Sequence, residues 1–234
     1  VHDLRLAREA GLIPWELYVR GPKVKAYRDT RGPGLDAFLA VLARVDGVAD
    51  GTQHRNGVLL MLLFVLLIRR GEVAALRVGD IDLVGSRVFV KGKGMQEQAP
   101  LSMPNALRDR IRAYLDTRHG PPPEAPLVVS FSPRKSKDNA GGLTANGIYR
   151  IVQRLFDQTN IPAQHVTPHG IRHTAITSAL DATNGDIRRV RSFARHAKVE
   201  TTLVYDDNRR DVGGEVANKL ADLVKVDPTP NRPR

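Results

Sequence analysis

The sequence H-G-I-R-H at residues 169–173 decides how this chain is interpreted. Residues three or four positions apart lie on one face of an α-helix. Pro168 suits the first turn of such a helix, because the N–H group that it lacks would have no partner there. We therefore predict a helix that begins at Pro168 and projects His169, Arg172 and His173 toward one point. His169 and Arg172 are expected to act on a ligand, and His173 to support its neighbours.

A second segment, A-R-H-A-K-V-E-T-T-L-V-Y, occupies residues 194–205. It adds His196 and, nine residues later, Tyr205. Imidazoles, a guanidinium and a phenol together suit chemistry on a phosphate, because Arg binds phosphate oxygens in a fork, His moves protons and Tyr can attack phosphorus. A tyrosine considered alone is more often a half-buried core aromatic, so the spacing from His196 carries the functional interpretation of Tyr205.

The composition favours a polyanionic partner. The 234 residues include 36 Lys and Arg against 25 Asp and Glu, which gives a formal net charge of +11. Nucleic acid is the commonest partner of so basic a chain, although a basic solvated surface is the simpler alternative. The chain contains no Cys, which excludes disulfides, thiolate metal sites and cysteine nucleophiles. This absence is compatible with a reducing cytoplasmic location.

The longest apolar run, from Gly57 to Ile68, predicts a buried core helix. It is about 12 residues long, short of the roughly 18 that cross a membrane, so we expect no membrane association. The chain begins with Val1 rather than Met, and we interpret it as a fragment of a longer protein.

The remaining pattern predicts further helices and a few short strands. Residues 35–45 have helical spacing and precede a polar break at 46–55. Thr144 is placed to cap a helix that ends near residue 160. Other expected elements are a short helix within 74–83, short strands at 80–83, 87–90, 98–101 and 127–131, helices at 107–117 and 212–224, and an irregular tail from 228.

Two upstream motifs carry further candidate residues. In L-I-R-R-G-E at residues 67–72, Glu72 follows Arg69 by three positions and can orient a buried guanidinium. An ordinary surface ion pair is the alternative, and Arg70 is a competitor that lacks this spacing. In V-K-G-K-G at residues 90–94, Lys93 stands between two glycines on an expected hairpin turn, where it could donate a proton or simply anchor a phosphate. Lys91 is the runner-up for this role.

Taken in order, these motifs resemble the tyrosine recombinase (phage integrase) family. That family has an Arg with a following Glu, a hairpin Lys, an H-x-x-R-H box, and a Gly-His pair nine residues before a nucleophilic Tyr. This chain departs from the pattern in having Ile68 and no Gly before Arg69, and in having Arg195 where the Gly is usual. No chemical group is lost, so the departures affect local packing rather than mechanism.

The resemblance implies a role for each matched residue. Tyr205 attacks a DNA phosphate, and Arg69, oriented by Glu72, acts with Arg172 to hold its non-bridging oxygens. His169 accepts the phenol proton. The resemblance further implies that His196 donates a hydrogen bond to the phosphate and that Lys93 protonates the leaving 5′ oxygen. We expect no metal or cofactor, because the cationic side chains supply the positive charge.

The resemblance also implies a fold that is mainly α with a small antiparallel β-sheet (α+β). We expect a catalytic domain at residues 35–225, preceded at 1–34 by the remnant of an N-terminal core-binding domain with its linker, and followed by a disordered tail at 226–234. An N-terminal arm of a single domain is the alternative for 1–34. The expected partner is double-stranded DNA, on which the chain would form a homo-oligomer, a tetramer, through its C-terminal segment.

Two other functions and one other site remain open. A type IB topoisomerase-like enzyme would use the same chemistry to relax supercoils, and a DNA-binding module would carry the residues in an inactive site. The four-residue spacing of His165, His169 and His173 suggests zinc. However, Pro168 should place His165 outside the helix, so we do not expect a metal site.

Overall fold

The computed structural model describes residues 10–12, 32–91, 97–131, 141–159, 165–196, 198–207 and 220. Several predictions lie outside these ranges. They concern Lys93 and its hairpin turn, most of residues 1–34, the C-terminal helix except Leu220, and the tail.

The described fold is mainly helical, as predicted. Its helices are α2 (Leu35–Asp46), α3 (Gly51–Val65), α4 (Arg70–Ala75), α5 (Asn105–Asp116), α6 (Ala145–Asp157), α7 (Pro168–Ala182), α8 (Ile187–Phe193) and α9 (Glu200–Asp207), with a 3₁₀ turn η1 (Val78–Asp80). A three-stranded antiparallel sheet has the order β1 (Ile81–Asp82), β2 (Arg87–Lys91) and β3 (Gln98–Ser102). The predicted small antiparallel sheet is therefore confirmed.

Helix α3 is the centre of the larger core and contacts α2, α4, α5 and α7. Its residues from Val58 to Leu63 are all buried. The helix begins six residues before the predicted apolar start, because the side chain of Asp50 accepts a hydrogen bond from the Gln53 amide and caps it. The polar break that the sequence predicts after α2 is therefore short, and half of it, residues 51–55, forms the first turn and a half of α3.

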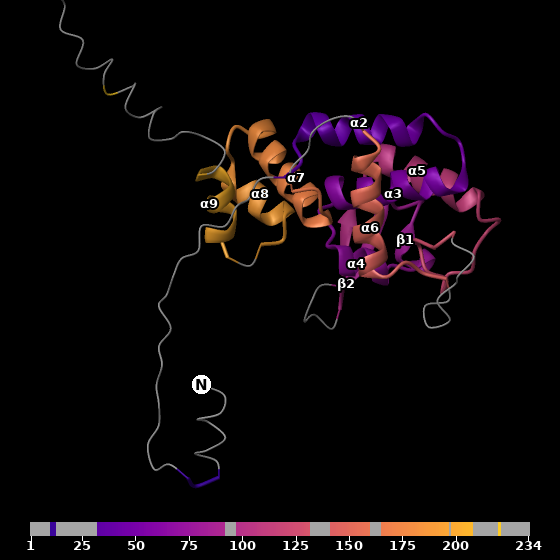
Figure 1. The fold of residues 1–234 in the computed structure, drawn as a ribbon, viewed down its shortest axis with the longest axis horizontal. Coiled ribbons are helices and arrows are strands. Elements are labelled where there is room, and N and C mark those ends of the chain that lie inside the picture. Colours follow the sequence, from indigo (N-terminus) through magenta and orange to yellow (C-terminus); the bar gives the residue numbers. More distant parts are fainter. Residues whose placement is uncertain are drawn as a thin grey trace, which may run out of the picture.

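A smaller core lies beneath α7, α8 and α9, which are grouped at one end of the molecule in Figure 1. Its buried members are Leu67, Ala175, Ile176, Leu180, Val190, Ala194 and Tyr205. Leu67 comes from the segment between α3 and α4. The smaller core thus joins the end of α3 to the two helices on either side of the His196 segment, and this contact brings distant motifs together.

The predicted strand at residues 127–131 is wrong. Its backbone makes single pairings with different partners, since the Leu127 amide donates to the Leu76 carbonyl while the Val128 carbonyl accepts from the Leu143 amide. Arginine side chains bind its other carbonyls, with Arg55 donating to that of Val129 and Arg118 to those of residues 126 and 127. Leu127 and Val128 are buried as predicted, whereas Phe131 is 47% exposed. Single hydrogen bonds from several partners take the place of one neighbouring strand.

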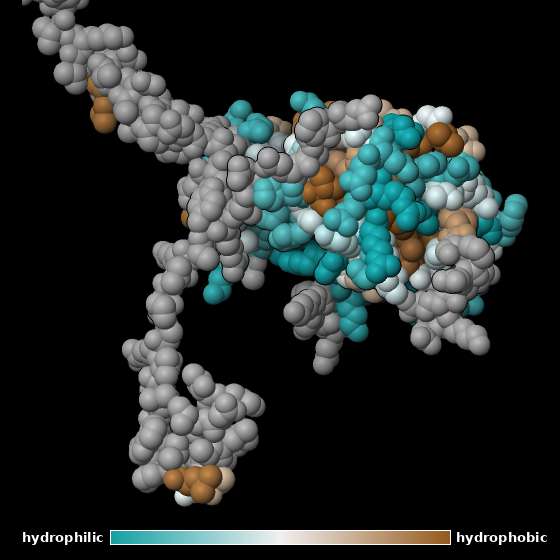
Figure 2. Space-filling model, in the orientation of Figure 1, coloured by the Kyte–Doolittle hydropathy of each residue, from teal (hydrophilic) through white to brown (hydrophobic). Residues whose placement is uncertain are grey.

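Hydrophilic side chains cover most of the described surface over α6 and α4 (Figure 2). Among the helices that the structure describes, none is both long and apolar enough to cross a membrane.

Candidate active site

Helix α7 starts as the sequence predicts. Pro168 occupies its first turn, and the hydroxyl of Thr167 accepts a hydrogen bond from the Gly170 amide at 2.8 Å. One turn further, Arg172 and His173 are buried, whereas His169 remains exposed at the start of the helix. The local capping therefore fixes where the helix begins and which way the three side chains project.

Arg172 is held by backbone carbonyls on two other segments. Its Nη1 donates to the carbonyl of Leu67, and its Nη2 donates to the carbonyl of Ala194. Only 3% of the residue is exposed. Burial, followed by the charges of Arg69 and Arg195, lowers the pKa of Arg172 to about 10. The guanidinium is still protonated at neutral pH, and its two hydrogen bonds join α7 to the segment that follows α3 and to the end of α8.

Arg69 and Glu72 form the ion pair that the sequence predicts, in a different setting. Arg69 is the N-cap of α4, and its Nη1 donates to Glu72 Oε1 at 3.0 Å while its backbone amide donates to Oε2 at 2.9 Å. Burial raises the pKa of Glu72, but these bonds and the charge of Arg195 outweigh it, so the pKa lies below its ordinary value. The side chain of Arg69 is 47% exposed, so the expectation of a buried guanidinium was wrong. It faces solvent because α4 begins at the surface.

The aromatic rings of the two predicted segments form a continuous row. The rings of His169 and His173 are 4.2 Å apart and nearly perpendicular. The ring of His173 is 5.0 Å from that of Tyr205, which is in turn 5.9 Å from that of His196. Tyr205 is only 4% exposed. The structure therefore brings the phenol to the histidines, with His173 between His169 and Tyr205.

Both outer histidines favour the neutral form. Burial, then the charges of Arg172 and Arg69, lowers the pKa of His196 to about 4. The pKa of His169 is lowered by the same causes in the same order, since its inner edge packs on His173 even though the residue remains exposed. Neutral imidazoles can accept protons at neutral pH. The shared charge effects also show that the two arginines and two histidines lie near one another.

The structure adds contacts that the motifs did not predict. Thr202 is fully buried, and its hydroxyl lies 2.9 Å from Nδ1 of His196. Arg195 Nη2 donates to Glu72 Oε2 at 2.9 Å and to the Leu67 carbonyl at 3.3 Å. The position of Thr202 could have been found from the sequence, since residues three apart on a helix share a face and Thr202 lies three residues before Tyr205. Nothing in the pattern indicates that the Leu67 carbonyl accepts from two arginines.

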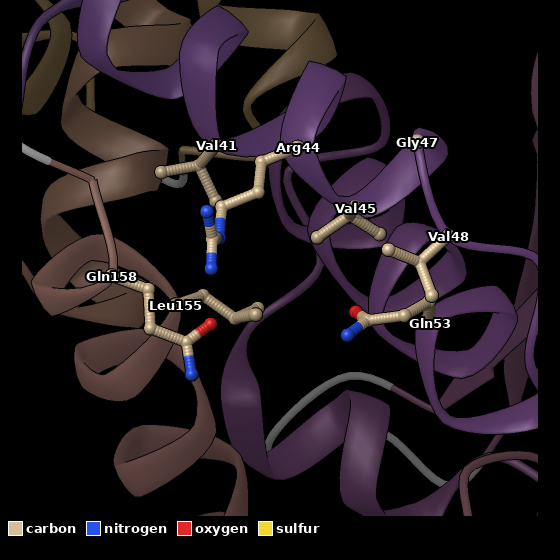
Figure 3. A pocket seen from close by; sticks show the side chains of 8 residues that line it. All are labelled: Val41, Arg44, Val45, Gly47, Val48, Gln53, Leu155 and Gln158. Atoms are coloured by element: carbon tan, nitrogen blue, oxygen red, sulfur yellow. The ribbon is translucent and has the colours of Figure 1, made fainter.

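Among the described residues, no group of three or more His, Asp or Glu side chains is arranged to hold a metal ion. A surface pocket lies elsewhere, between α2, α3 and α6 (Figure 3). It is lined by Val41, Arg44, Val45, Gly47, Val48, Gln53, Leu155 and Gln158. None of these residues is among the catalytic candidates that the sequence predicts. We place the candidate site at the cluster of Arg69, Arg172, His169, His196 and Tyr205, because the predicted groups lie together there.

Known families and proteins resemble the chain across this region. The model of the phage integrase family matches residues 37–211. A tyrosine recombinase of Synechococcus elongatus is 33% identical over 224 residues, which are 94% of this chain and 68% of that protein. The tyrosine recombinase XerA of Thermococcus kodakarensis is 28% identical over 163 residues, which are 69% of this chain and 54% of XerA.

Solved structures share the fold. A crystal structure of XerA recombinase has a TM-score of 0.61 and 23% identity, and the match covers 87% of this chain and 66% of that one. The XerH site-specific recombinase, solved bound to its difH substrate after cleavage, has a TM-score of 0.63 and 19% identity, with 83% of this chain and 54% of that chain covered.

Proposed function

The chain belongs to the phage integrase family, and we propose that it is a site-specific DNA recombinase that cuts and rejoins strands through a 3′-phosphotyrosyl intermediate. The observation that carries the proposal is the row of rings from His169 to His196, with Tyr205 inside it and Arg172 beside it. A phenol among neutral imidazoles and guanidiniums suits attack on a phosphodiester.

The chemistry follows from the groups present. The phenol oxygen of Tyr205 forms a bond to phosphorus, and the bond from phosphorus to the 5′ oxygen breaks. His169 takes the phenol proton, because a phenol with an ordinary pKa of about 10 is a poor nucleophile at neutral pH. Lys93 gives a proton to the departing 5′ oxygen. Attack by another 5′ hydroxyl reverses these steps, so rejoining needs no ATP.

Arg69 and Arg172 stabilise the charge that develops on the non-bridging oxygens. Glu72 orients the exposed guanidinium of Arg69 by accepting a hydrogen bond from its Nη1, and a second bond from the Arg69 backbone amide holds the carboxylate in place. The two backbone carbonyls that hold Arg172 leave its remaining N–H groups for phosphate. His196, oriented by Thr202, donates a further hydrogen bond to the phosphate. His173 supports the ring of Tyr205.

The DNA partner agrees with the net charge of +11. We further propose that copies of the protein assemble on DNA through residues 212–224, as a tetramer with the DNA strands between subunits, and that the reaction takes place in the cytoplasm. Mass photometry with and without duplex DNA tests the assembly. A complex with a single protein copy at every concentration contradicts it.

Covalent trapping tests the chemistry. The DNA is a library of nicked duplexes. The nick lets the cleaved strand end diffuse away, which prevents rejoining, and the randomised sequence around the nick covers the unknown target. Wild type is expected to form a DNA adduct that survives denaturing gels, and Tyr205→Phe is expected to form none. Tyr149→Phe serves as the matched control, because Tyr149 lies on α6 and its hydroxyl bonds Gln153.

Three results would redirect the proposal. Equal trapping by Tyr205→Phe removes the nucleophile assignment, and no trapping by wild type on any sequence indicates a binding module. Relaxation of supercoiled plasmids without a special sequence indicates a topoisomerase-like enzyme instead.

A further inference from the structure

Arg195 lies at the junction between the two halves of the site and has an unusual backbone. Its φ is +54°, a left-handed conformation that glycine adopts freely and that other residues adopt at a cost. The residue directly precedes His196 and follows Ala194, whose carbonyl binds Arg172. A strained residue at such a position calls for a compensating contact of its side chain.

That contact crosses to the segment between α3 and α4 and to the first turn of α4. Arg195 Nη2 donates to Glu72 Oε2 at 2.9 Å and to the carbonyl of Leu67 at 3.3 Å. The two side chains are mostly buried, with exposed fractions of 20% for Arg195 and 7% for Glu72. An ion pair with so little solvent around it is screened far less than one on the surface. The contact therefore fixes the chain before His196 against the turn that carries Arg69.

Glu72 is consequently shared between two arginines. Its Oε1 binds Arg69 while its Oε2 binds Arg195 and the Arg69 backbone amide. The Leu67 carbonyl is shared in the same way by Arg195 and Arg172. Arg195 is thus bonded to one group that orients Arg69 and to one that orients Arg172, although it is assigned no contact with phosphate itself.

We propose that Arg195 is a positioning residue for the cleavage step, which clamps the His196–Tyr205 segment onto the Arg69–Glu72 turn. This inference rests on the proposed function. Without the clamp, the segment of chain that carries His196 and Tyr205 is free to shift relative to Arg69 and Arg172. Misplacing a nucleophile by about 1 Å is enough to slow a reaction roughly 100-fold. The clamp therefore governs the rate of attack more than the affinity for DNA.

Arg195→Gly is the sharpest test, since it removes the ion pair and also relieves the left-handed strain, so the variant should fold. Single-turnover trapping at saturating nicked DNA is expected to slow at least tenfold, with a dissociation constant for DNA within about twofold of wild type. Arg195→Lys keeps the charge and can bond Glu72, and should restore part of the rate. Arg189→Ala on α8, whose arginine pairs with Asp186 at an exposed position, should trap like wild type.

A double-mutant cycle and an activity-independent readout complete the experiment. If Arg195 acts through Glu72, Glu72→Gln combined with Arg195→Gly slows trapping by much less than the product of the single effects. Hydrogen exchange of the amides from 194 to 205 should be faster in Arg195→Gly than in wild type, whether or not the protein cuts DNA.

These readouts separate the clamp from the proposed function. Wild type that never forms an adduct refutes the proposed function, and the exchange measurement still decides whether the clamp exists. Wild-type trapping with an unchanged saturated rate in Arg195→Gly overturns the inference. So does a variant that loses only DNA affinity, because Arg195 would then act as a DNA contact.

Discussion

At the scale of single residues, the two arginines assigned to phosphate are held in opposite ways. Arg172 is buried and bonded to the carbonyls of Leu67 and Ala194, whereas Arg69 is half exposed and bonded to Glu72. The guanidinium of Arg172 is therefore packed in the interior, and that of Arg69 lies at the surface. Substitutions of both should slow the reaction, but only those of Arg172 should also lower stability substantially.

Arg172→Ala should slow covalent trapping at least about 100-fold, because it removes a donor to the developing charge. It should also lower the free energy of unfolding by about 1–3 kcal/mol, since the Ala194 carbonyl loses the arginine that binds it and the Leu67 carbonyl keeps only Arg195. Arg69→Ala should slow trapping as strongly but lower the free energy of unfolding by at most about 1 kcal/mol, because its guanidinium is half exposed and Glu72 keeps Arg195 as a partner. Urea denaturation beside single-turnover trapping measures both. Equal stability losses in the two variants would contradict this difference in setting.

The histidines predict how stability depends on pH. The pKa values of His169 and His196 lie below the ordinary 6.5, that of His196 at about 4. Between pH 6.5 and 4 these two histidines bind fewer protons in the folded protein than in the unfolded chain. Their contribution to the free energy of unfolding is therefore complete above pH 6.5 and is lost as the pH falls toward 4. The urea midpoint should therefore fall between pH 6.5 and 4.5.

The double variant His169→Gln, His196→Gln should show a flatter dependence over this interval. His119→Gln is the control, since His119 is exposed and lies outside the site. The contribution of Glu72, whose pKa is lowered, is lost only below about its ordinary 4.5 and does not interfere. An identical slope in wild type and the double variant would rule out the histidines as the cause.

Sequence predicted the residue types of the site better than their contacts. The spacing on one helix was enough to place His169, Arg172 and His173 together. The ion pair from Arg195 to Glu72 joins residues 123 positions apart, and the acceptor for Arg172 is a backbone carbonyl. Motif spacing carries no information on either, because both depend on how α7 and α8 pack on the end of α3.

At the scale of elements, α6 and α7 begin with the same local pattern in different surroundings. Thr144 and Thr167 both cap their helices, and each accepts a bond from a glycine three residues later. The sequence predicted the cap at Thr144 and the start at Pro168, because capping depends only on neighbouring residues. It missed the early start of α3, although the Asp50 cap is a local signal. It also missed the irregular path of 127–131, because arginine side chains and residues 141–143 bind that backbone.

The two glycines make a matched pair for a test of packing. A Cβ on Gly170 would lie 1.9 Å from the His165 carbonyl oxygen, whereas a Cβ on Gly147 would meet its nearest neighbour at 3.4 Å. Gly170→Ala should lower the free energy of unfolding by about 1–3 kcal/mol, through overpacking. Gly147→Ala should raise it by about 0.5–1 kcal/mol, because alanine favours the helix. Thermal or urea unfolding measures both, and a neutral Gly170→Ala would refute the tight packing at the start of α7.

At the scale of the whole molecule, the site is formed where two cores meet. The larger core around α3 contains Ile68 and Val73, on either side of Arg69 and Glu72, and the smaller core contains Leu67 and Tyr205. Arg69 and Glu72 thus lie beside the larger core. Tyr205 belongs to the smaller core, and Arg172 bonds the carbonyls of two of its members, Leu67 and Ala194. Composition predicted the partner from net charge, and the family pattern predicted the helical fold with its small sheet.

The net charge of +11 predicts strongly salt-dependent DNA binding. Each phosphate that the protein neutralises releases counterions, so affinity falls with salt concentration. Between 50 and 200 mM salt, the affinity for duplex DNA should decrease at least roughly tenfold. Fluorescence anisotropy measures it, with sucrose at matched osmolarity as the control. Affinity that does not change over this interval would argue against a mainly electrostatic contact.

The most direct measurement is a crystal structure of the Tyr205→Phe variant bound to nicked duplex DNA. We predict that one scissile phosphate lies within about 3 Å of guanidinium nitrogens from both Arg69 and Arg172, beside the ring at position 205. A phosphate held by Arg69 alone, with Arg172 and residue 205 directed away from the DNA, would contradict the proposed reaction.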